Sequence, residues 1–328
     1  MSTDAAKTAF LFPGQGAQAV GMGGAGAIPP AQSLIADYYP PDRRSKAIGV
    51  YMMCSMAGYV IGLVAGGWIA QHYGWRAAFF IVGLPGLLLA LTTRFLLAEP
   101  RHLPQFAIRA QSQEAVTATF RALFEKPSYR NVIGAMVLYF LMAYGALLFT
   151  ASFMMRVHGL SVSEAGALFG GLSAAGAIVG NIGGGIITDY LAKRDIAWTA
   201  RLPGWGLILA LPLYEVAFMA PTIPIMAGAL FLASIFLTGV IPPMFSALHA
   251  VCGSARRAMA VAIAFFFANL IGLGLGPVIA GSLSDWFAQS YGSADGLRYA
   301  LMTVMVTFVP SGILMLRAAR TLRADMED

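Results

Sequence analysis

Five polar side chains interrupt long apolar stretches of this sequence, and each could contact a solute inside an apolar fold. They are Tyr139, Tyr144, Asn181, Glu215 and Asn269. An amide or a phenol could hydrogen-bond a bound molecule, and the Glu215 carboxyl could also carry a proton. Each has a plainer alternative. Asn269 could instead join two helices, helix packing is favoured for Asn181 and the tyrosines, and Glu215 could lie near an interface with its carboxylate in water.

The composition indicates the environment of these groups. The 328 residues are 58% hydrophobic and 11% charged, whereas a soluble domain is roughly 45–50% apolar and 25% charged. Apolar stretches approach or exceed the roughly 20 residues that cross a bilayer as a helix. We therefore predict an all-α integral membrane fold of about nine transmembrane helices, near residues 18–39, 47–71, 76–98, 131–154, 165–188, 202–220, 223–249, 258–285 and 298–317.

The basic residues fix an expected orientation. When successive connections are assigned to alternate sides, almost all Lys and Arg residues fall on one side, and only Arg76, Arg156 and Arg298 fall on the other. The positive-inside rule then places the C-terminus in the cytoplasm and the N-terminus outside. The net charge of +6 follows from this topology, so we expect no nucleic-acid partner. The four histidines form no metal-ligand pair, and we expect no metal and no cofactor.

The sequence contains an internal repeat. Gly26, Pro29, Pro30, Arg43 and Arg44 find counterparts of the same type and order at Gly239, Pro242, Pro243, Arg256 and Arg257. Glycines spaced along the following helix also match in the two copies, and small residues at such intervals let helices pack closely. These predicted packing glycines are Gly58, Gly62 and Gly67 in the first copy and Gly272, Gly276 and Gly281 in the second.

Several motifs resemble one transporter family. "IPPAQSLIADYYPPDRRSKAIGVY", "GNIGGGIITDYLAKR" and "NLIGLGLGPVIAGSLSD" are similar to the major facilitator superfamily, most closely its spinster-like branch. The resemblance implies helices four to twelve of a twelve-helix fold that works by alternating access within the lipid bilayer. It also implies a small organic or amphipathic, lipid-like solute as substrate, with coupling to protons as one alternative.

One motif resembles the cytoplasmic gating motif of that family. It comprises Gly185, Asp189, Lys193 and Arg194. An acid at a helix end beside two bases could make charge-assisted contacts that hold one state of the gate. The alternative is a charged loop that only fixes topology, and we favour gating. With this site we group the repeated basic pairs of the two cytoplasmic loops, Arg43, Arg44, Arg256 and Arg257.

The sequence also departs from the spinster-like pattern. Gly24 and Ala17 stand where that branch carries a coupling Glu and Arg. Aligning the repeat leaves no room before residue 1 for three helices, so we expect an N-terminally truncated transporter. Such a chain could be active, could need a partner chain that supplies the missing helices, or could be a non-transporting truncation or fusion product.

The expected organisation has five parts. A linker at 99–130 separates a partial N-terminal bundle at 24–98 from a six-helix bundle at 131–318, and a cytoplasmic tail occupies 319–328. Within the linker, "TATFRALFEK" could form an amphipathic helix on the membrane surface or remain a solvated connection.

The remaining part, residues 1–23, carries a different resemblance. "AFLFPGQGAQAVGMG" is similar to the opening of malonyl-CoA:acyl-carrier-protein transacylases over residues 9–23. In that family the matching glutamine, here Gln15, helps to form an oxyanion hole. Acyl transfer also needs a nucleophilic serine in a Gly-x-Ser-x-Gly turn, and the sequence contains none. We therefore expect no enzymatic activity.

Overall fold

The computed structural model describes residues 43–51 and 116–326, with single residues and short groups between 35 and 92. Predictions that concern residues 1–34 and 93–115, the transacylase-like segment among them, lie outside the described residues, as do Gly62 and Gly67. The described part of the chain is helical and holds no β-strand. The predicted all-α class is confirmed.

Ten helical elements follow one another between residues 116 and 325. They are α5 (Val116–Glu125), α6 (Pro127–His158), α7 (Val162–Ala192), α8 (Trp198–Met219), α9 (Ile223–Gly239), α10 (Ile241–Val251), α11 (Gly253–Phe267), the π-helix η4 (Ala268–Leu273), α12 (Gly274–Met305) and α13 (Phe308–Asp325).

The ends of α6 and α7 are set by polar and conformational signals that lie outside the apolar runs. Pro127 occupies the first turn of α6, where its missing N–H costs nothing. The helix ends at Gly159, which adopts φ 69° and ψ 19°, a left-handed conformation that glycine reaches without strain. Ser161 and Glu164 then form a capping box that starts α7. Both helices consequently exceed the predicted apolar runs at each end.

Three breaks divide the later part of the chain. Val240 separates α9 from α10, beside the repeated Pro242 and Pro243. The π-helix η4 interrupts the helix that follows α10. The helical run of 67 residues from Met259 to Asp325 would extend about 100 Å if straight, whereas a bilayer core is about 30 Å thick. It bends at Gly292, where φ is 79° and ψ 168°, and so forms two legs.

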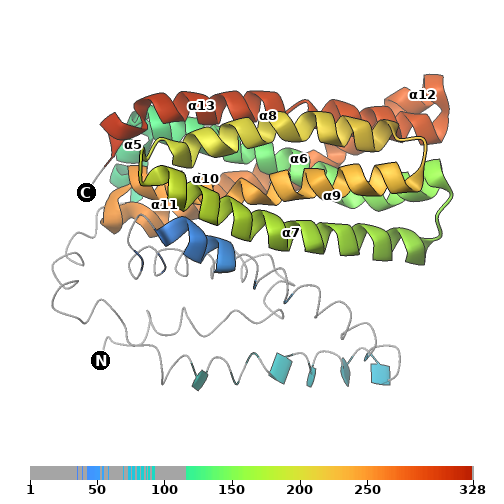
Figure 1. Cartoon of the computed structure of the whole chain (residues 1–328), viewed down its shortest axis with the longest axis horizontal. Coiled ribbons are helices and arrows are strands. Elements are labelled where there is room, and N and C mark those ends of the chain that lie inside the picture. Colours follow the sequence, from blue (N-terminus) through green and yellow to red (C-terminus); the bar gives the residue numbers. More distant parts are fainter. Residues whose placement is uncertain are drawn as a thin grey trace.

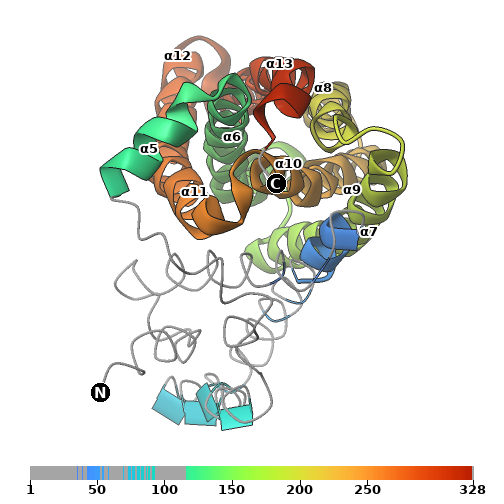
Figure 2. The same ribbon diagram turned by 90° about the vertical axis from the view of Figure 1, so that its left-hand side faces the viewer.

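The long helices lie side by side along one axis, and α5, α10 and α11 gather at the end where α13 finishes (Figure 1). Helix α6 packs against α12 and α13, α7 packs against α9, and α8 packs against α9 and α13. The short helix at 43–51 lies beside α7 in both views (Figures 1 and 2). We call the end that holds α10 and α11 the linker end, and the end with the Gly292 bend the far end.

Aromatic side chains fill the interior between these helices. The rings of Phe153 and Phe218 meet edge to face with their centroids 5.1 Å apart, and Tyr214 stacks on Phe308 at 5.7 Å. Since Phe153, Phe218 and Phe308 are fully buried, this cluster ties α6, α8 and α13 together. Such rings contribute both buried area and specific ring contacts.

The stretch predicted as either an amphipathic helix or a solvated connection forms α5. Its Thr119 and Leu123 side chains are buried. Phe124 packs on Tyr129 of α6 and on Phe267 of α11, with centroid distances of 5.4 and 6.4 Å. The opposite side carries an exposed ion pair between Arg121 and Glu125. The segment is thus an amphipathic helix that packs against the bundle, and not a plain connection.

Candidate functional site

The gating motif lies at a contact between two distant parts of the chain. Asp189, near the end of α7, accepts hydrogen bonds from the backbone N–H groups of Ser45 at 3.1 Å and Lys46 at 2.8 Å. Those amides belong to the first described turn of helix 43–51. Amides in the first turn of a helix have no acceptor within the helix, and they carry partial positive charge. The Asp189 carboxylate, only 7% exposed, therefore satisfies them and joins the two helices.

Two glycines allow the backbones to meet at this contact. A Cβ atom at Gly185 would lie 2.8 Å from the Ser45 carbonyl oxygen, and one at Gly49 would lie 2.5 Å from the Asn181 carbonyl oxygen. Real Cβ atoms do not approach other atoms so closely, so any side chain at either position would push the helices apart. Asn181 itself is buried, and its Nδ2 donates to Ala177 of the same helix at 2.9 Å.

Two of the four repeated arginines are buried next to the same histidine. Arg44, from the first copy of the repeat, and Arg257, from the second, are both buried, and the charges of both act on the fully buried His249 of α10. The other two, Arg43 and Arg256, are exposed and half-buried respectively. The structure thus brings one arginine of each repeat copy to the same buried histidine.

The two bases of the gating motif lie outside the contact. Lys193 and Arg194 are exposed. Arg194 donates to the Tyr190 hydroxyl at 3.1 Å and lies 5.3 Å from the centre of that ring. Among the described residues, the Lys193 side chain makes no ion pair or hydrogen bond. The carboxylate of Asp189 therefore bonds to a helix terminus and not to the bases that follow it.

A second polar group, which we call the interior polar group, is half-buried between α6 and η4. The Tyr144 hydroxyl of α6 donates to Oδ1 of Asn269 at 3.3 Å, and Asn269 Nδ2 donates to Phe265 at 2.8 Å. Asn269 lies in η4, where the wider helix turn leaves backbone groups less regularly paired. Tyr139 is buried and donates to the Leu237 carbonyl of α9 at 3.0 Å. The structure therefore pairs Tyr144 with Asn269, while Tyr139 links two helices.

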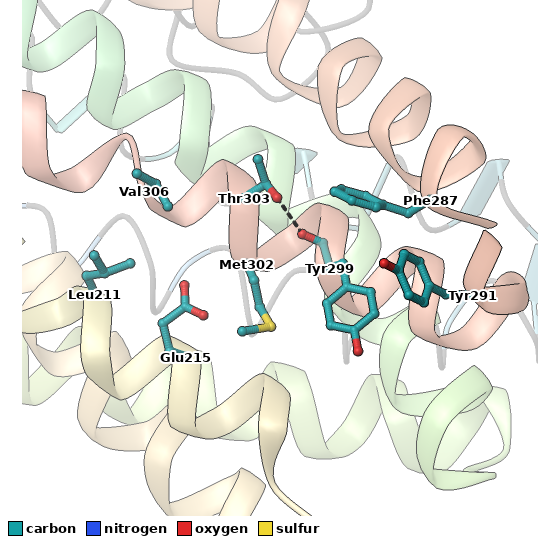
Figure 3. A pocket seen from close by; sticks show the side chains of 8 residues that line it. All are labelled: Leu211, Glu215, Phe287, Tyr291, Tyr299, Met302, Thr303 and Val306. Carbon is teal, nitrogen blue, oxygen red and sulfur yellow. Dashed lines mark hydrogen bonds between the residues drawn. The ribbon is translucent and has the colours of Figure 1, made fainter. Parts of the chain in front are cut away.

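Glu215 lies apart from both polar groups. It sits one turn before α8 ends at Met219, at the far end of the bundle. It lines a pocket together with residues of the two legs of α12 (Figure 3). The structure thus does not bring Glu215 together with Asn269, Tyr144 or Asp189.

The predicted packing glycines differ in their surroundings. A Cβ atom at Gly272 would lie 2.9 Å from Phe140, and one at Gly276 would clash with the Leu141 carbonyl of α6, so both lie against that helix. A Cβ atom at Gly281 would make only an ordinary contact, 3.5 Å from Phe149, and none of the described atoms lies within 4 Å of Gly58.

The closest glycine contact in the described part of the chain joins α7 to α9, and its glycines are not among the predicted packing glycines. Gly176, Gly180 and Gly184 are spaced four apart on α7, and a Cβ atom at each would clash with Ser234, Thr238 or Gly239 of α9. Thr238 also donates to the Gly176 carbonyl at 3.2 Å. The signal was present in the sequence, since small residues at this spacing form one strip along a helix.

An ion-pair network at the linker end was also missed. Asp195, in the turn between α7 and α8, lies 2.9 Å from Arg201 and 2.9 Å from Arg323 of α13. The Ala197 amide donates to the carboxylate at 2.9 Å and holds the pKa of Asp195 below its usual 3.8, and the two arginines lower it further. Sequence alone could not pair groups 128 residues apart.

We expect Asp195→Asn to destabilise the protein by about 1 kcal/mol, since these pairs are partly exposed and screened by water. The folded pKa lies below the unfolded value, so ionised Asp195 stabilises the fold above pH 3.8, and this contribution is lost as the pH falls through the folded pKa. Thermal unfolding of both proteins across acid pH checks this. The difference in melting temperature should shrink toward zero at the lowest pH, and a constant difference would exclude the network as its cause.

Comparison with known proteins decides the family. The pattern of the Major Facilitator Superfamily matches residues 16–217, which is more than half of the chain. The chain belongs to the Major Facilitator Superfamily. It is thus an integral, multi-pass membrane protein.

Relatives of this facilitator are named as transporters of different kinds. It is 28% identical over 312 residues to an "MFS-type efflux pump" of Mycolicibacterium smegmatis, covering 94% of this chain and 71% of the pump. It is 29% identical over 191 residues to a "probable sphingolipid transporter spinster homolog 2" of Arabidopsis thaliana, covering 52% of this chain and 38% of the relative. The matched region thus spans less than half of the plant relative.

Solved structures place the fold in the same group. A bacterial homologue of the human lysosomal transporter Spinster, in an inward-facing and unoccupied conformation, matches with a TM-score of 0.62 and 27% identity. The match covers 92% of this chain and 76% of that one. The fucose:proton symporter of Escherichia coli matches with a TM-score of 0.63 at 14% identity, covering 92% and 74% of the two chains, a likeness of fold alone. The chain is therefore spinster-like among facilitators.

Proposed function

We propose that this protein is a secondary active transporter that moves a small organic or amphipathic solute by alternating access. The observation that carries the proposal is the bond from Asp189 to the amides of Ser45 and Lys46. This contact joins helix 43–51, in the first half of the chain, to the bundle of the second half. The amides that it uses lack an acceptor within their own helix because they lie at its end. Such a contact can form and break as a unit, as a gate between two states requires.

The gate is assigned to the cytoplasmic side. The linker end carries Arg43, Arg44, Arg256 and Arg257 as well as the Asp195 network, and an excess of bases marks cytoplasmic connections. In this assignment the bonds of Asp189 hold the cytoplasmic side closed. Arg44 and Arg257 act beside the gate, and the C-terminus is cytoplasmic.

The solute site is assigned to the interior polar group. Tyr144 and Asn269 present a phenol and an amide between α6 and η4, within a surrounding of apolar and aromatic side chains. Their mutual bond of 3.3 Å is long, so a solute could replace it at little cost. The relatives carry names for an efflux pump, a cis,cis-muconate transport protein and sphingolipid transporters, and an organic solute with apolar parts is the class that fits this site.

Transport by the full chain in proteoliposomes tests the proposal. Three solutes represent the classes of solute that the relatives' names indicate: cis,cis-muconate, an amphipathic cationic dye and a fluorescent short-chain sphingolipid. We expect at least one of the three solutes to cross the proteoliposome membrane when a pH gradient or an outward gradient of that solute is imposed. A second facilitator of known activity, reconstituted in parallel, serves as the positive control. If that control transports while this protein moves none of the three, the chain is a non-transporting membrane protein.

We expect Tyr144→Phe and Asn269→Leu each to raise the KM for the transported solute by about 2- to 10-fold, the loss of one hydrogen bond. The matched control is Thr150→Val, because Thr150 is also buried on α6 but donates only to Ala146 of its own helix, at 2.8 Å. Initial uptake rates over a range of solute concentrations measure the effect. An unchanged KM in both variants would remove the solute site from this position.

A further inference from the structure

A pocket at the far end of the bundle has no role in the gate or in the interior polar group. Its volume is about 590 Å³. Its lining comes from α8 and from both legs of α12, as Figure 3 shows, and consists of Leu211, Glu215, Phe287, Tyr291, Tyr299, Met302, Thr303 and Val306. The interior group lies instead on α6 and η4, so the two sites use different helices.

Glu215 gives this pocket its charge. The carboxylate extends from α8 into the space beside Met302 (Figure 3). It makes no ion pair or hydrogen bond with any residue that the structure describes, and none of the lining residues is basic. Arg298, the basic residue on the adjacent leg, is paired with Asp295 at 2.5 Å. A carboxylate among apolar side chains in a membrane protein is costly without a cation.

Three aromatic rings complete the lining on the side opposite Glu215. The centroid of Tyr299 lies 5.0 Å from that of Tyr291 and 6.0 Å from that of Phe287. Aromatic faces attract organic cations through the ring quadrupole, most strongly where water is partly excluded. A carboxylate and aromatic rings that line one pocket are the combination that suits an alkylammonium group.

The rim of the pocket is apolar and exposed. Of the lining residues, Tyr291 and Val306 are more than half exposed. Trp286, next to Phe287 in the sequence, and Val216 and Met219, within one turn of Glu215, are exposed as well. Exposed apolar side chains on membrane-spanning helices face the lipid. A ligand that reached the pocket from the bilayer would carry an apolar tail.

From these features we propose that the pocket beside Glu215 binds the ammonium group of an amphipathic amine, with the carboxylate and the rings of Tyr291, Tyr299 and Phe287 around the charge. The same chemistry has two sources, the ethanolamine headgroup of a lipid and a free long-chain amine. The site does not depend on transport, and it lies at the end of the bundle away from the gate.

Native mass spectrometry of the full chain in a non-ionic maltoside detergent tests this site. One arm compares dodecylamine with dodecanol. The other compares phosphatidylethanolamine with phosphatidylglycerol of the same acyl chains. We expect one equivalent of the amine, of the ethanolamine lipid or of both to bind about tenfold more tightly than its comparator.

Variants connect that binding to the pocket. Glu215→Gln should weaken it about tenfold and Tyr299→Leu about 3- to 5-fold. Asp285→Asn should leave it unchanged, because Asp285 is an exposed acid on the same leg of α12 that does not line the pocket. Preference for dodecylamine alone assigns the site to free amines, and preference for the lipid alone assigns it to headgroups. No preference in either arm, or full binding by Glu215→Gln, would overturn the proposal.

Discussion

Replacing Asp189 with alanine is expected to lower gradient-driven solute accumulation by about tenfold or more, because the protein loses its cytoplasmically closed state. The carboxylate makes two bonds to helix amides in a buried position. Hydrogen bonds to a charged group contribute about 1.5–3 kcal/mol each. The loss of both bonds would move the equilibrium between closed and open states by about 100-fold or more.

Initial rates in proteoliposomes, at equal amounts of inserted protein, measure the effect of Asp189→Ala. Thr188→Val is the matched control, because its buried hydroxyl donates only to Gly184 of the same helix and does not reach helix 43–51. The initial rate of Asp189→Asn should lie between those of Asp189→Ala and Thr188→Val, since an amide keeps an acceptor oxygen but loses the charge. Wild-type rates in Asp189→Ala would show that the contact is not a gate.

Gly184→Ala is expected to destabilise the protein by about 3 kcal/mol, whereas the neighbouring Gly183→Ala is expected to be neutral or stabilising. A Cβ atom at Gly184 would clash with the backbone of Gly239, which cannot turn aside as a side chain can. Overpacking of this kind costs about 1–3 kcal/mol or more. At Gly183 none of the atoms that the structure describes lies within 4 Å of an added Cβ atom, and alanine favours helix over glycine by about 1 kcal/mol.

Thermal unfolding in detergent, followed with a thiol-reactive fluorogenic dye, compares these two variants. Cys252 is fully buried and reports unfolding, and Cys54, which is exposed, is replaced by serine in both proteins. Gly184→Ala should unfold several degrees below Gly183→Ala. Equal melting temperatures would mean that α7 and α9 do not pack through their glycines.

Much of the second half could be predicted from the sequence, because membrane-spanning helices reveal themselves by long apolar runs. The stretch at 202–220, for example, corresponds to α8 (Trp198–Met219). The ends were harder to predict. Ser161 and Glu164 form a capping box outside the apolar run, and the bend at Gly292 depends on a backbone conformation that composition does not reveal.

The candidate sites were less predictable, because they depend on which helices become neighbours. The sequence pointed to Asp189 but favoured Lys193 and Arg194 as its partners, whereas the structure gives it the amides of Ser45 and Lys46. Backbone groups carry no sequence signature, so such a partner cannot be recognised from residue type. Glu215 was identified as a charge within an apolar run, but the aromatic rings that line the same pocket come from α12, much later in the chain.

The distance between spin labels at Lys46→Cys and Lys193→Cys tests the gate most directly. Both side chains are exposed, and they lie on the two sides of the Asp189 contact. The labels are placed in a background without Cys54 and Cys252, and electron paramagnetic resonance measures the distance in proteoliposomes. We predict a short and a long population, with the long one increased by a solute gradient and dominant in Asp189→Ala. One unchanged distribution under all these conditions would contradict alternating access at this contact.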